Sequence, residues 1–140
     1  MFDETVLSSN REETFFDESF ATVWHDDETD AVVAQMTSYT EGAAFREYMD
    51  AVADAADETR SDCVLADTRE QPTLDTADQE WAATEWGPRA EASGVQKLAT
   101  IVPESVLAEM SVQRVFDESP DDIEREFFDS VADAKSWLTD

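Results

Sequence analysis

The sequence predicts an α/β domain in which an antiparallel hairpin is followed by strands joined through crossover helices. Short runs of apolar, aromatic and β-branched residues alternate with segments whose apolar residues recur at helical spacing. A chain of 140 residues fits one domain. Its 41% apolar residues, including eight Phe and four Trp, are enough to form a core. Strands that alternate with helices are typical of a sheet with crossover connections.

The first part of the predicted sheet is the hairpin. Residues 1–13 are polar and are expected to form an arm or a first edge element, so that the domain proper covers 14–140. The segment 14–24, TFFDESFATVW, predicts one strand or two short ones. The polar cluster at 25–30 predicts a turn, and the apolar run at 31–39 predicts the returning strand.

Two helices and a buried strand are expected after the hairpin. Helical spacing of apolar residues predicts a helix over 41–58, with Thr40 as its N-cap. The apolar run at 63–69 predicts a buried strand. A second helix is predicted over 76–93, with a kink or break near Trp86 because a Gly-Pro pair follows that residue.

The last part of the chain predicts a buried strand, a short helix, a loop, an edge strand and a final helix. The buried strand is expected at 95–103, the short helix at 103–110, the loop at 116–122 and the edge strand at 123–128. The final helix is expected after an N-cap at Asp129 or Ser130 and up to Leu138. The resulting order is β-β-α-β-α-β-α-β-α. Its crossovers are expected to be right-handed.

Acidic residues dominate the charge. Asp and Glu number 35 against 9 Lys and Arg, which gives a formal net charge of −26 at pH 7. Molar salt shortens the Debye length to about 3 Å and screens the repulsion, so the composition is typical of a salt-accumulating, halophilic cytoplasm. A nucleic-acid mimic or a calcium protein would also be acidic. Direct nucleic-acid contact and anionic membrane surfaces are disfavoured, because phosphate contact needs a basic face.

Three features of the sequence bear on its compartment. Cys63 is the only cysteine, so no disulfide forms within the chain. The first residues have neither the basic nor the apolar region of a signal peptide. No apolar run approaches the roughly 18 residues of a membrane helix. We therefore expect a cytoplasmic protein that does not bind a membrane.

No arrangement of residues predicts a catalytic or metal centre. His25, the only histidine, is expected to be exposed in an acidic turn. Cys63 begins a buried strand without a basic neighbour, which favours a structural thiol. With three glycines, the chain has no glycine-rich phosphate loop. We expect no cofactor, no metal and no enzymatic activity; an enzyme would need carboxylates such as Asp67 and Asp78 as acid and base.

One region combines residue types that suit a binding surface. It comprises the end of the strand at 63–69 and the helix that follows. Open α/β sheets bind ligands and partners at the carboxyl ends of their strands, and Trp and Arg are frequent interface anchors. In the competing interpretation the Trp packs in the core and the Arg pairs with a nearby acid. The candidate partner-binding residues are Asp67, Thr68, Arg69, Gln79, Trp86 and Arg89.

A series of short motifs runs in a fixed order between residues 14 and 138. After the hairpin come L-A-D-T-R at a strand end, D-Q-E-W and W-G-P-R-A on the next helix, G-V-Q-K-L-A, and finally F-F-D-S-V-A-D-A-K-S-W-L. This layout resembles the anti-sigma-factor-antagonist-like (STAS) family. The resemblance implies a mixed four- to five-stranded sheet with crossover helices mainly on one face. It also implies an interaction module rather than an enzyme.

The same resemblance bears on phosphorylation. In the antagonist members of the family, a serine in a D-S-S-G stretch is phosphorylated by a partner kinase at a helix start after the central strand. This sequence departs from that motif and reads D-T-R-E-Q-P-T-L-D-T. The resemblance implies Thr68, Thr73 or Thr76 as the acceptor. Nearby acids such as Glu70 and Asp75 would oppose a phosphate there.

Together these observations predict a non-enzymatic regulatory or protein-interaction module of a halophilic cytoplasm, with a protein as its partner. The alternative is a module of the same fold that binds a small apolar ligand or a lipid. A homodimer through the hairpin edge or the strand at 123–128 is a further alternative. The apolar site of the ligand-binding alternative would be lined by Phe15, Phe16, Phe20, Trp24, Phe127 and Phe128.

Overall fold

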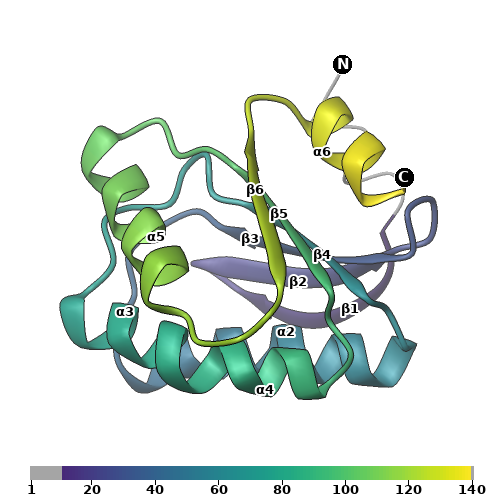
Figure 1. Cartoon of the computed structure of the whole chain (residues 1–140), viewed down its shortest axis with the longest axis horizontal. Helices are drawn as coiled ribbons and strands as arrows, with labels where there is room; N and C mark the ends of the chain where they lie inside the picture. The colour runs from purple at the N-terminus through teal and green to yellow at the C-terminus, as the bar shows by residue number, and fades with distance from the viewer. Residues whose placement is uncertain (1–10, 140) are drawn as a thin grey trace.

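A six-stranded mixed sheet forms the centre of the computed structural model, which describes residues 11–139. The strands lie in the sheet in the same order as in the chain (Figure 1). They are β1 (Arg11–Glu18), β2 (Ala21–Asp26), β3 (Ala31–Met36), β4 (Cys63–Asp67), β5 (Lys97–Ile101) and β6 (Glu124–Phe128). The helical elements are α2 (Ala43–Thr59), α3 (Thr76–Trp81), the π-helical η1 (Ala82–Trp86), α4 (Gly87–Ala92), α5 (Val106–Glu118) and α6 (Val131–Leu138).

The sheet combines two pairing modes. Strands β1, β2 and β3 form an antiparallel meander, and β3, β4, β5 and β6 pair in parallel. In the parallel part the register places Ala34 beside Ala66, and Ala66 beside Thr100. A row of three small residues therefore crosses three neighbouring strands.

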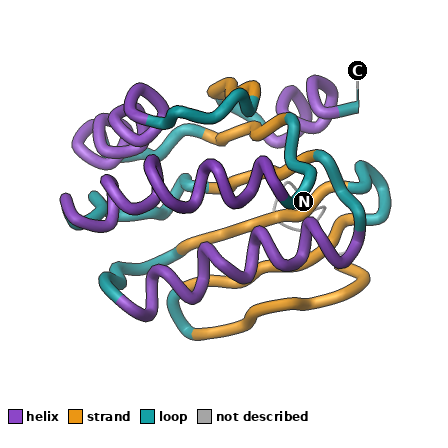
Figure 2. The backbone as a smooth tube through the Cα atoms, turned by 60° about the horizontal axis from the view of Figure 1, so that its bottom comes forward, coloured by secondary structure: helices purple, strands orange, loops and turns teal. Residues whose placement is uncertain are grey.

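The two faces of the sheet support two separate cores. Side chains alternate along each strand, so Val32 and Ala34 of β3 face one core while Ala31 and Val33 face the other. Helices α2, α3, α4 and α5 cover the first face, and α6 packs on the second. Successive crossovers of one hand that advance in one direction place their helices on the same face. Helix α2 and the α3–α4 segment run side by side across it (Figure 2).

The predicted α/β class and the mixed sheet are confirmed, but the sheet has six strands instead of four to five. The segment 14–24 is divided because Glu18 pairs with Ala21 across a two-residue turn. The first of the two strands begins at Arg11, so it includes three residues that the sequence assigned to the arm. Residues 1–10 of that arm lie outside the described part of the chain.

The predicted short helix at 103–110 is wrong in its length. Helix α5 begins after Ser105, whose side-chain oxygen accepts a hydrogen bond from the backbone N–H of Ala108 at 3.3 Å. It continues to Glu118 because its later turns carry apolar side chains, including Phe116, that pack against the first core. The helix therefore takes in the beginning of the segment predicted as a loop.

The second predicted helix is continuous, and its irregularity takes the form of a π turn. Segment η1 directly precedes Gly87 and Pro88. Proline cannot donate the backbone hydrogen bond of a regular helix and its ring clashes with the carbonyl four residues earlier. A π turn has a wider spacing of hydrogen bonds, and here it carries the chain past the proline without ending the helix. The disturbance predicted near Trp86 is thus present as a π turn.

Candidate protein-interaction site

The carboxyl end of β4 carries a buried, fully paired carboxylate. Asp67 is 2% exposed. Its Oδ2 accepts hydrogen bonds from Gln35 Nε2 at 3.0 Å and from Arg69 Nη2 at 2.7 Å. Its Oδ1 accepts from Arg69 Nε at 2.9 Å. This planar, two-point contact is the arrangement that a guanidinium prefers, and it positions Arg69 at the sheet edge.

A polar depression lies at this edge. It is lined by Gln35, Met36, Asp67, Arg69, Glu70 and Glu104. The side chain of Arg69 is 22% exposed, and Glu70 and Glu104 are exposed. The sequence prediction that Asp67 and Arg69 lie at the carboxyl end of the buried strand agrees with this geometry. Because Asp67 is buried beneath Arg69, the guanidinium and the two glutamates are the groups that face solvent.

Helix α5 begins beside this depression and presents an apolar surface. The backbone N–H of Glu104 donates to the carbonyl of Arg69 at 3.2 Å, which holds the two loops together. Three residues of the first turns of the helix, Val106, Leu107 and Met110, are 71%, 66% and 61% exposed. We refer to these three residues as the α5 apolar surface.

The sequence reasoning missed this surface, although the sequence contains its signal. The residues of α5 that pack inward are Ala108, Ser111, Val112, Val115 and Phe116. Those positions recur at helical spacing and form a complete inner face without help from the first turn. Apolar side chains left over outside that face have to lie on the opposite side of the helix. The sequence predicted a helix that ends at residue 110. So short a helix contains only Ala108 of the inner face, and its inward and outward apolar residues could therefore not be told apart.

Two residues predicted to bind a partner, Gln79 and Trp86, are buried instead. Trp86 is 3% exposed, and its Nε1 donates to the carbonyl of Met49 at 2.6 Å. Gln79 Nε2 donates to the carbonyl of Leu74 at 2.8 Å. The Trp86 ring packs in the first core. Trp86 is therefore a core side chain, which is the competing interpretation that the sequence left open.

Arg89 connects two helices. Its Nη1 contacts Asp50 at 2.6 Å, and its Nη2 contacts Asp54, so the guanidinium of α4 bridges two carboxylates of α2. The side chain is 42% exposed. Arg89 therefore pairs with nearby acids, which is the alternative that the sequence left open for this residue. It is not part of the α5 apolar surface.

The three candidate phospho-acceptors differ in accessibility. Thr68 is buried, and its hydroxyl donates to the carbonyl of Ile101 at 2.5 Å. Thr73 and Thr76 are exposed. Thr76 is the first residue of α3, next to the N-cap Asp75. Of the three, Thr73 and Thr76 are thus the ones that a kinase could reach in the folded state, and their phosphorylation stays a prediction.

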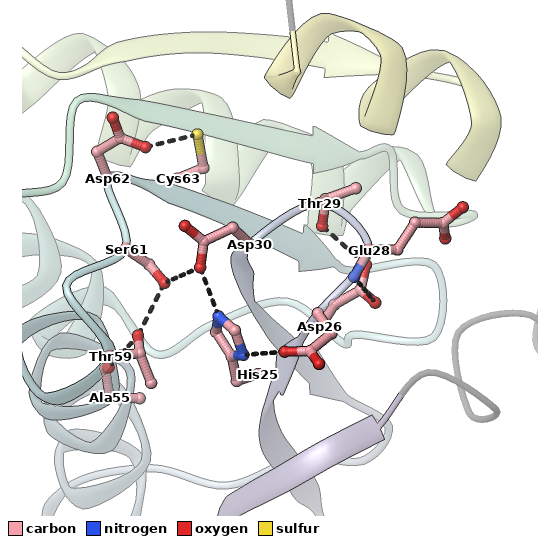
Figure 3. A network of polar contacts seen from close by, with 11 residues as sticks. His25, Asp26, Glu28, Thr29, Asp30, Ala55, Thr59, Ser61, Asp62 and Cys63 are labelled. Carbon is pink, nitrogen blue, oxygen red and sulfur yellow. Dashed lines mark hydrogen bonds and ion pairs between the residues drawn. The ribbon is translucent and has the colours of Figure 1, made fainter.

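A polar network around His25 connects the β2–β3 turn to the start of β4 (Figure 3). His25 Nε2 lies 2.8 Å from Asp30 Oδ1, and its Nδ1 lies 3.6 Å from Asp27 Oδ1. Ser61 Oγ donates to Asp30 at 3.4 Å. The side chain of His25 is 12% exposed, so the expectation of an exposed histidine is wrong. The serine contacts the carboxylate rather than the imidazole, which is not the nucleophile–base contact of a hydrolase.

Cys63 lies next to this network and has the properties of a structural thiol. Burial, together with the neighbouring Asp62, raises the pKa of the Cys63 thiol to about 12. Its Sγ is 3.2 Å from Asp62 Oδ1 and 3.6 Å from the carbonyl of Leu138. A reactive cysteine needs a lowered pKa, so this site favours the unreactive form.

Two features are absent from the part of the chain that the structure describes. Among residues 11–139, no group of three or more His, Cys, Asp or Glu side chains is placed to hold a metal ion. In the same part of the chain, no helix combines the length and apolar character needed to cross a membrane. Comparisons of the chain with protein-family models, with curated proteins and with solved structures find no match.

Proposed function

We propose that this protein is a non-enzymatic interaction module that docks a partner protein on the α5 apolar surface and the adjoining polar depression. The observation that carries the proposal is the exposure of Val106, Leu107 and Met110 in a chain of net charge −26. Apolar side chains that cluster on the surface and are bordered by polar groups are characteristic of protein contact sites. Burying them against a partner would supply the central, water-excluding part of an interface.

The surroundings of the surface indicate the chemistry of the partner. Glu70, Glu104 and Glu109 are exposed around it. Electrostatic complementarity favours a partner that brings basic groups to this rim and an apolar side chain to the centre. Nucleic acid is a poor fit, because its phosphates would face the same acidic rim.

A second copy of the chain is a less favourable occupant. It would bring an identical acidic rim to the contact, and like charges that face each other oppose association. The edge strand β6 has the same difficulty, since Glu124 and Glu126 are exposed on it. These charges support a different protein as the partner in place of the homodimer that the sequence left open.

The proposal is tested by charge insertion at the centre of the surface. Wild type, Leu107→Asp and Met110→Asp are used to capture partners from the native cells in molar KCl, with quantitative mass spectrometry as the readout. Ala132→Asp is the matched control, because it adds the same charge at an exposed position of α6, on the other face of the sheet. A partner that depends on this surface is lost with the first two variants and kept with the control.

Purified components then give the magnitude. We expect Leu107→Asp to weaken binding of the purified partner by at least about tenfold in isothermal titration calorimetry, as at the centre of an interface. Ala132→Asp should leave the affinity unchanged. Equal binding by wild type and both surface variants would contradict the proposed docking site.

A further inference from the structure

A cavity of about 90 Å³ lies between the sheet and the helices of its first face. Its floor includes Ala34, Ala66 and Thr100, the row of small residues that crosses β3, β4 and β5 in register. Because these side chains are short, the helices above cannot close the space over them completely. The cavity thus follows from the choice of three residues at one level of the sheet.

The walls of the cavity are mostly apolar and come from three helical elements. Tyr48 and Val52 belong to α2, Trp86 to the π turn η1, and Val112 and Phe116 to α5. A predominantly apolar lining with a few polar groups is typical of small-molecule sites. Single π turns inside helices are also frequent at functional sites, and here the π turn forms part of the wall.

Thr100 provides a buried hydroxyl group that is not hydrogen-bonded within the described part of the protein. Its side chain is 1% exposed, and its buried Oγ1 has no hydrogen-bond partner among the described residues. Buried hydroxyls are paired in the large majority of cases, and an exception calls for an explanation. A hydroxyl that is buried, unpaired and part of a cavity wall is placed to bond a molecule inside that cavity.

Three of the neighbouring polar groups are already engaged. Thr68 Oγ1 donates to the carbonyl of Ile101, and Trp86 Nε1 donates to that of Met49. The guanidinium of Arg125, which also lines the cavity, is paired with Asp121 at 2.7 Å. Its charge is therefore neutralised within the protein, and the cavity does not favour an anionic ligand.

We propose that this cavity binds a compact, mainly apolar molecule carrying one hydroxyl or carbonyl group, which pairs with Thr100 Oγ1. An engineered cavity of about 150 Å³ accepts benzene, so 90 Å³ accommodates roughly four non-hydrogen atoms on the same scale. The inference does not rest on the proposed docking of a protein, because the cavity lies on the inner side of α5 and the apolar surface on its outer side.

Water is the competing occupant of the cavity. A buried water is held by two to four polar partners as a rule. Thr100 offers one such partner, while the donors of Thr68 and Trp86 are used inside the protein. A molecule with one polar atom and an apolar body matches the unpaired Thr100 hydroxyl and the mainly apolar wall better than water does.

The test compares two probes of the same carbon skeleton. Propan-1-ol and 1-fluoropropane, each with four non-hydrogen atoms, are titrated into the ¹⁵N-labelled full chain in molar KCl, and amide shifts are followed by NMR. We expect saturable shifts at Ala66 and Thr100, with propan-1-ol bound about tenfold more tightly because it alone can exchange a full hydrogen bond with the threonine hydroxyl.

Variants assign the effect to the cavity. Thr100→Val keeps the shape and removes the hydroxyl, so the preference for propan-1-ol should disappear. Thr22→Val is the matched control on the opposite face of the sheet, and it should keep the preference. Ala66→Leu fills the cavity and should abolish binding of both probes. If it does not fold, Ala34→Val provides a smaller filling of the same floor.

Each outcome either supports or overturns the proposed binding site. Saturable binding that prefers the alcohol in wild type and in Thr22→Val, but not in Thr100→Val, supports the site. Three results would overturn it: no saturable shifts in the folded wild type, equal affinity of the two probes, or unchanged binding in a folded cavity-filled variant. A crystal structure grown with propan-1-ol that contains ordered water at Thr100 in its place would also overturn it.

Discussion

At the scale of single residues, burial separates side chains that the sequence leaves equivalent. Asp67 and Asp54 are both aspartates near an arginine, yet Asp67 is buried and contacted by two side chains, while Asp54 is exposed on α2. An exposed ion pair contributes little to stability, whereas a buried carboxylate needs all its partners. The position of the carboxylate therefore decides its role.

Cys63 provides a prediction about pH. A pKa of about 12 in the folded chain, against the ordinary value of about 9, leaves roughly a thousandfold less thiolate near pH 8. We expect iodoacetamide to alkylate the native protein at least about 100-fold more slowly than the urea-unfolded chain at pH 8. Mass spectrometry over time measures both rates.

The same raised pKa sets the sign of a stability effect. The thiol is retained in the folded chain but ionises in the unfolded one as the pH rises above about 9. Its contribution to stability is therefore complete below that pH and declines toward pH 12. Cys63→Ala should lack this component. Native labelling at the unfolded rate would show that the thiol is accessible and the expectation wrong.

Gly87 provides a prediction about close approach. A Cβ at this position would lie 2.1 Å from Asp121 Oδ2, which is itself held by Arg125. We expect Gly87→Ala to lower the free energy of unfolding by about 2 kcal/mol, because the Asp121–Arg125 pair would have to move. Urea unfolding followed by circular dichroism in molar KCl measures the change.

Gly42→Ala is the comparison for that measurement. Gly42 has a positive φ of 65°, but a Cβ there would meet nothing within 4 Å. Its φ of 65° is combined with a ψ of −135°, outside the left-handed helical region, so its substitution should cost backbone strain alone, about 1–3 kcal/mol. Asp121→Ala should reduce the loss at Gly87 and leave the loss at Gly42 unchanged; an undiminished loss at Gly87 in that background would contradict the steric explanation.

At the scale of elements, the α3–α4 segment combines a core contact with a surface contact. Trp86 fills space beneath the π turn, whereas Arg89 bridges to α2 at the surface. We expect Trp86→Ala to cost about 3–5 kcal/mol through the cavity that it leaves, and Arg89→Ala at most about 1 kcal/mol. Chemical denaturation of both variants tests this order. The reverse order would mean that the bridge between the helices, not the packed ring, holds the segment in place.

The sequence predicted much of the element order, for identifiable reasons. Buried strands such as β4 and β5 are short apolar runs, and they form where expected. The split between β1 and β2 was ambiguous because a two-residue turn at Ser19 and Phe20 contains no glycine or proline. Local sequence patterns do not show which residues pair across a turn, and it is this pairing that divides the segment into β1 and β2.

The candidate site was predicted in part. Asp67 and Arg69 were placed correctly at the carboxyl end of a buried strand, whereas the ion pair between them was not predicted. Trp86 was placed among surface residues because residue type alone does not show which side of a helix faces the sheet. The α5 apolar surface and the cavity depend on helix length and on strand register, which are tertiary properties.

At the scale of the whole molecule, charge governs the conditions under which the fold is stable. With a net charge of −26, the carboxylates repel one another unless salt screens them. We expect the melting temperature to rise by about 10 °C or more between 0.1 and 2 M KCl, because screening shortens the Debye length several-fold. Differential scanning calorimetry measures the change.

The control for the salt effect is a change of pH. Near pH 4 many carboxylates are protonated, so the rise in melting temperature with KCl should be smaller than at pH 7. A melting temperature that does not respond to KCl at pH 7 would contradict the electrostatic interpretation. An equal response at both pH values would assign the effect to the salting-out of apolar groups instead.

The strand order has a consequence for how the chain reaches this fold. In the described sheet every strand pairs with the strand made immediately before it, so no strand has to be inserted between two that are already joined. Pairing can therefore proceed in the direction of synthesis, with each new strand and its helix added to a growing edge. The two antiparallel connections close short loops, whereas each of the three parallel pairings spans one crossover helix, so no pairing has to reach further along the chain than one such crossover. A nascent chain of this topology can add its strands to the sheet in the order in which the ribosome synthesises them.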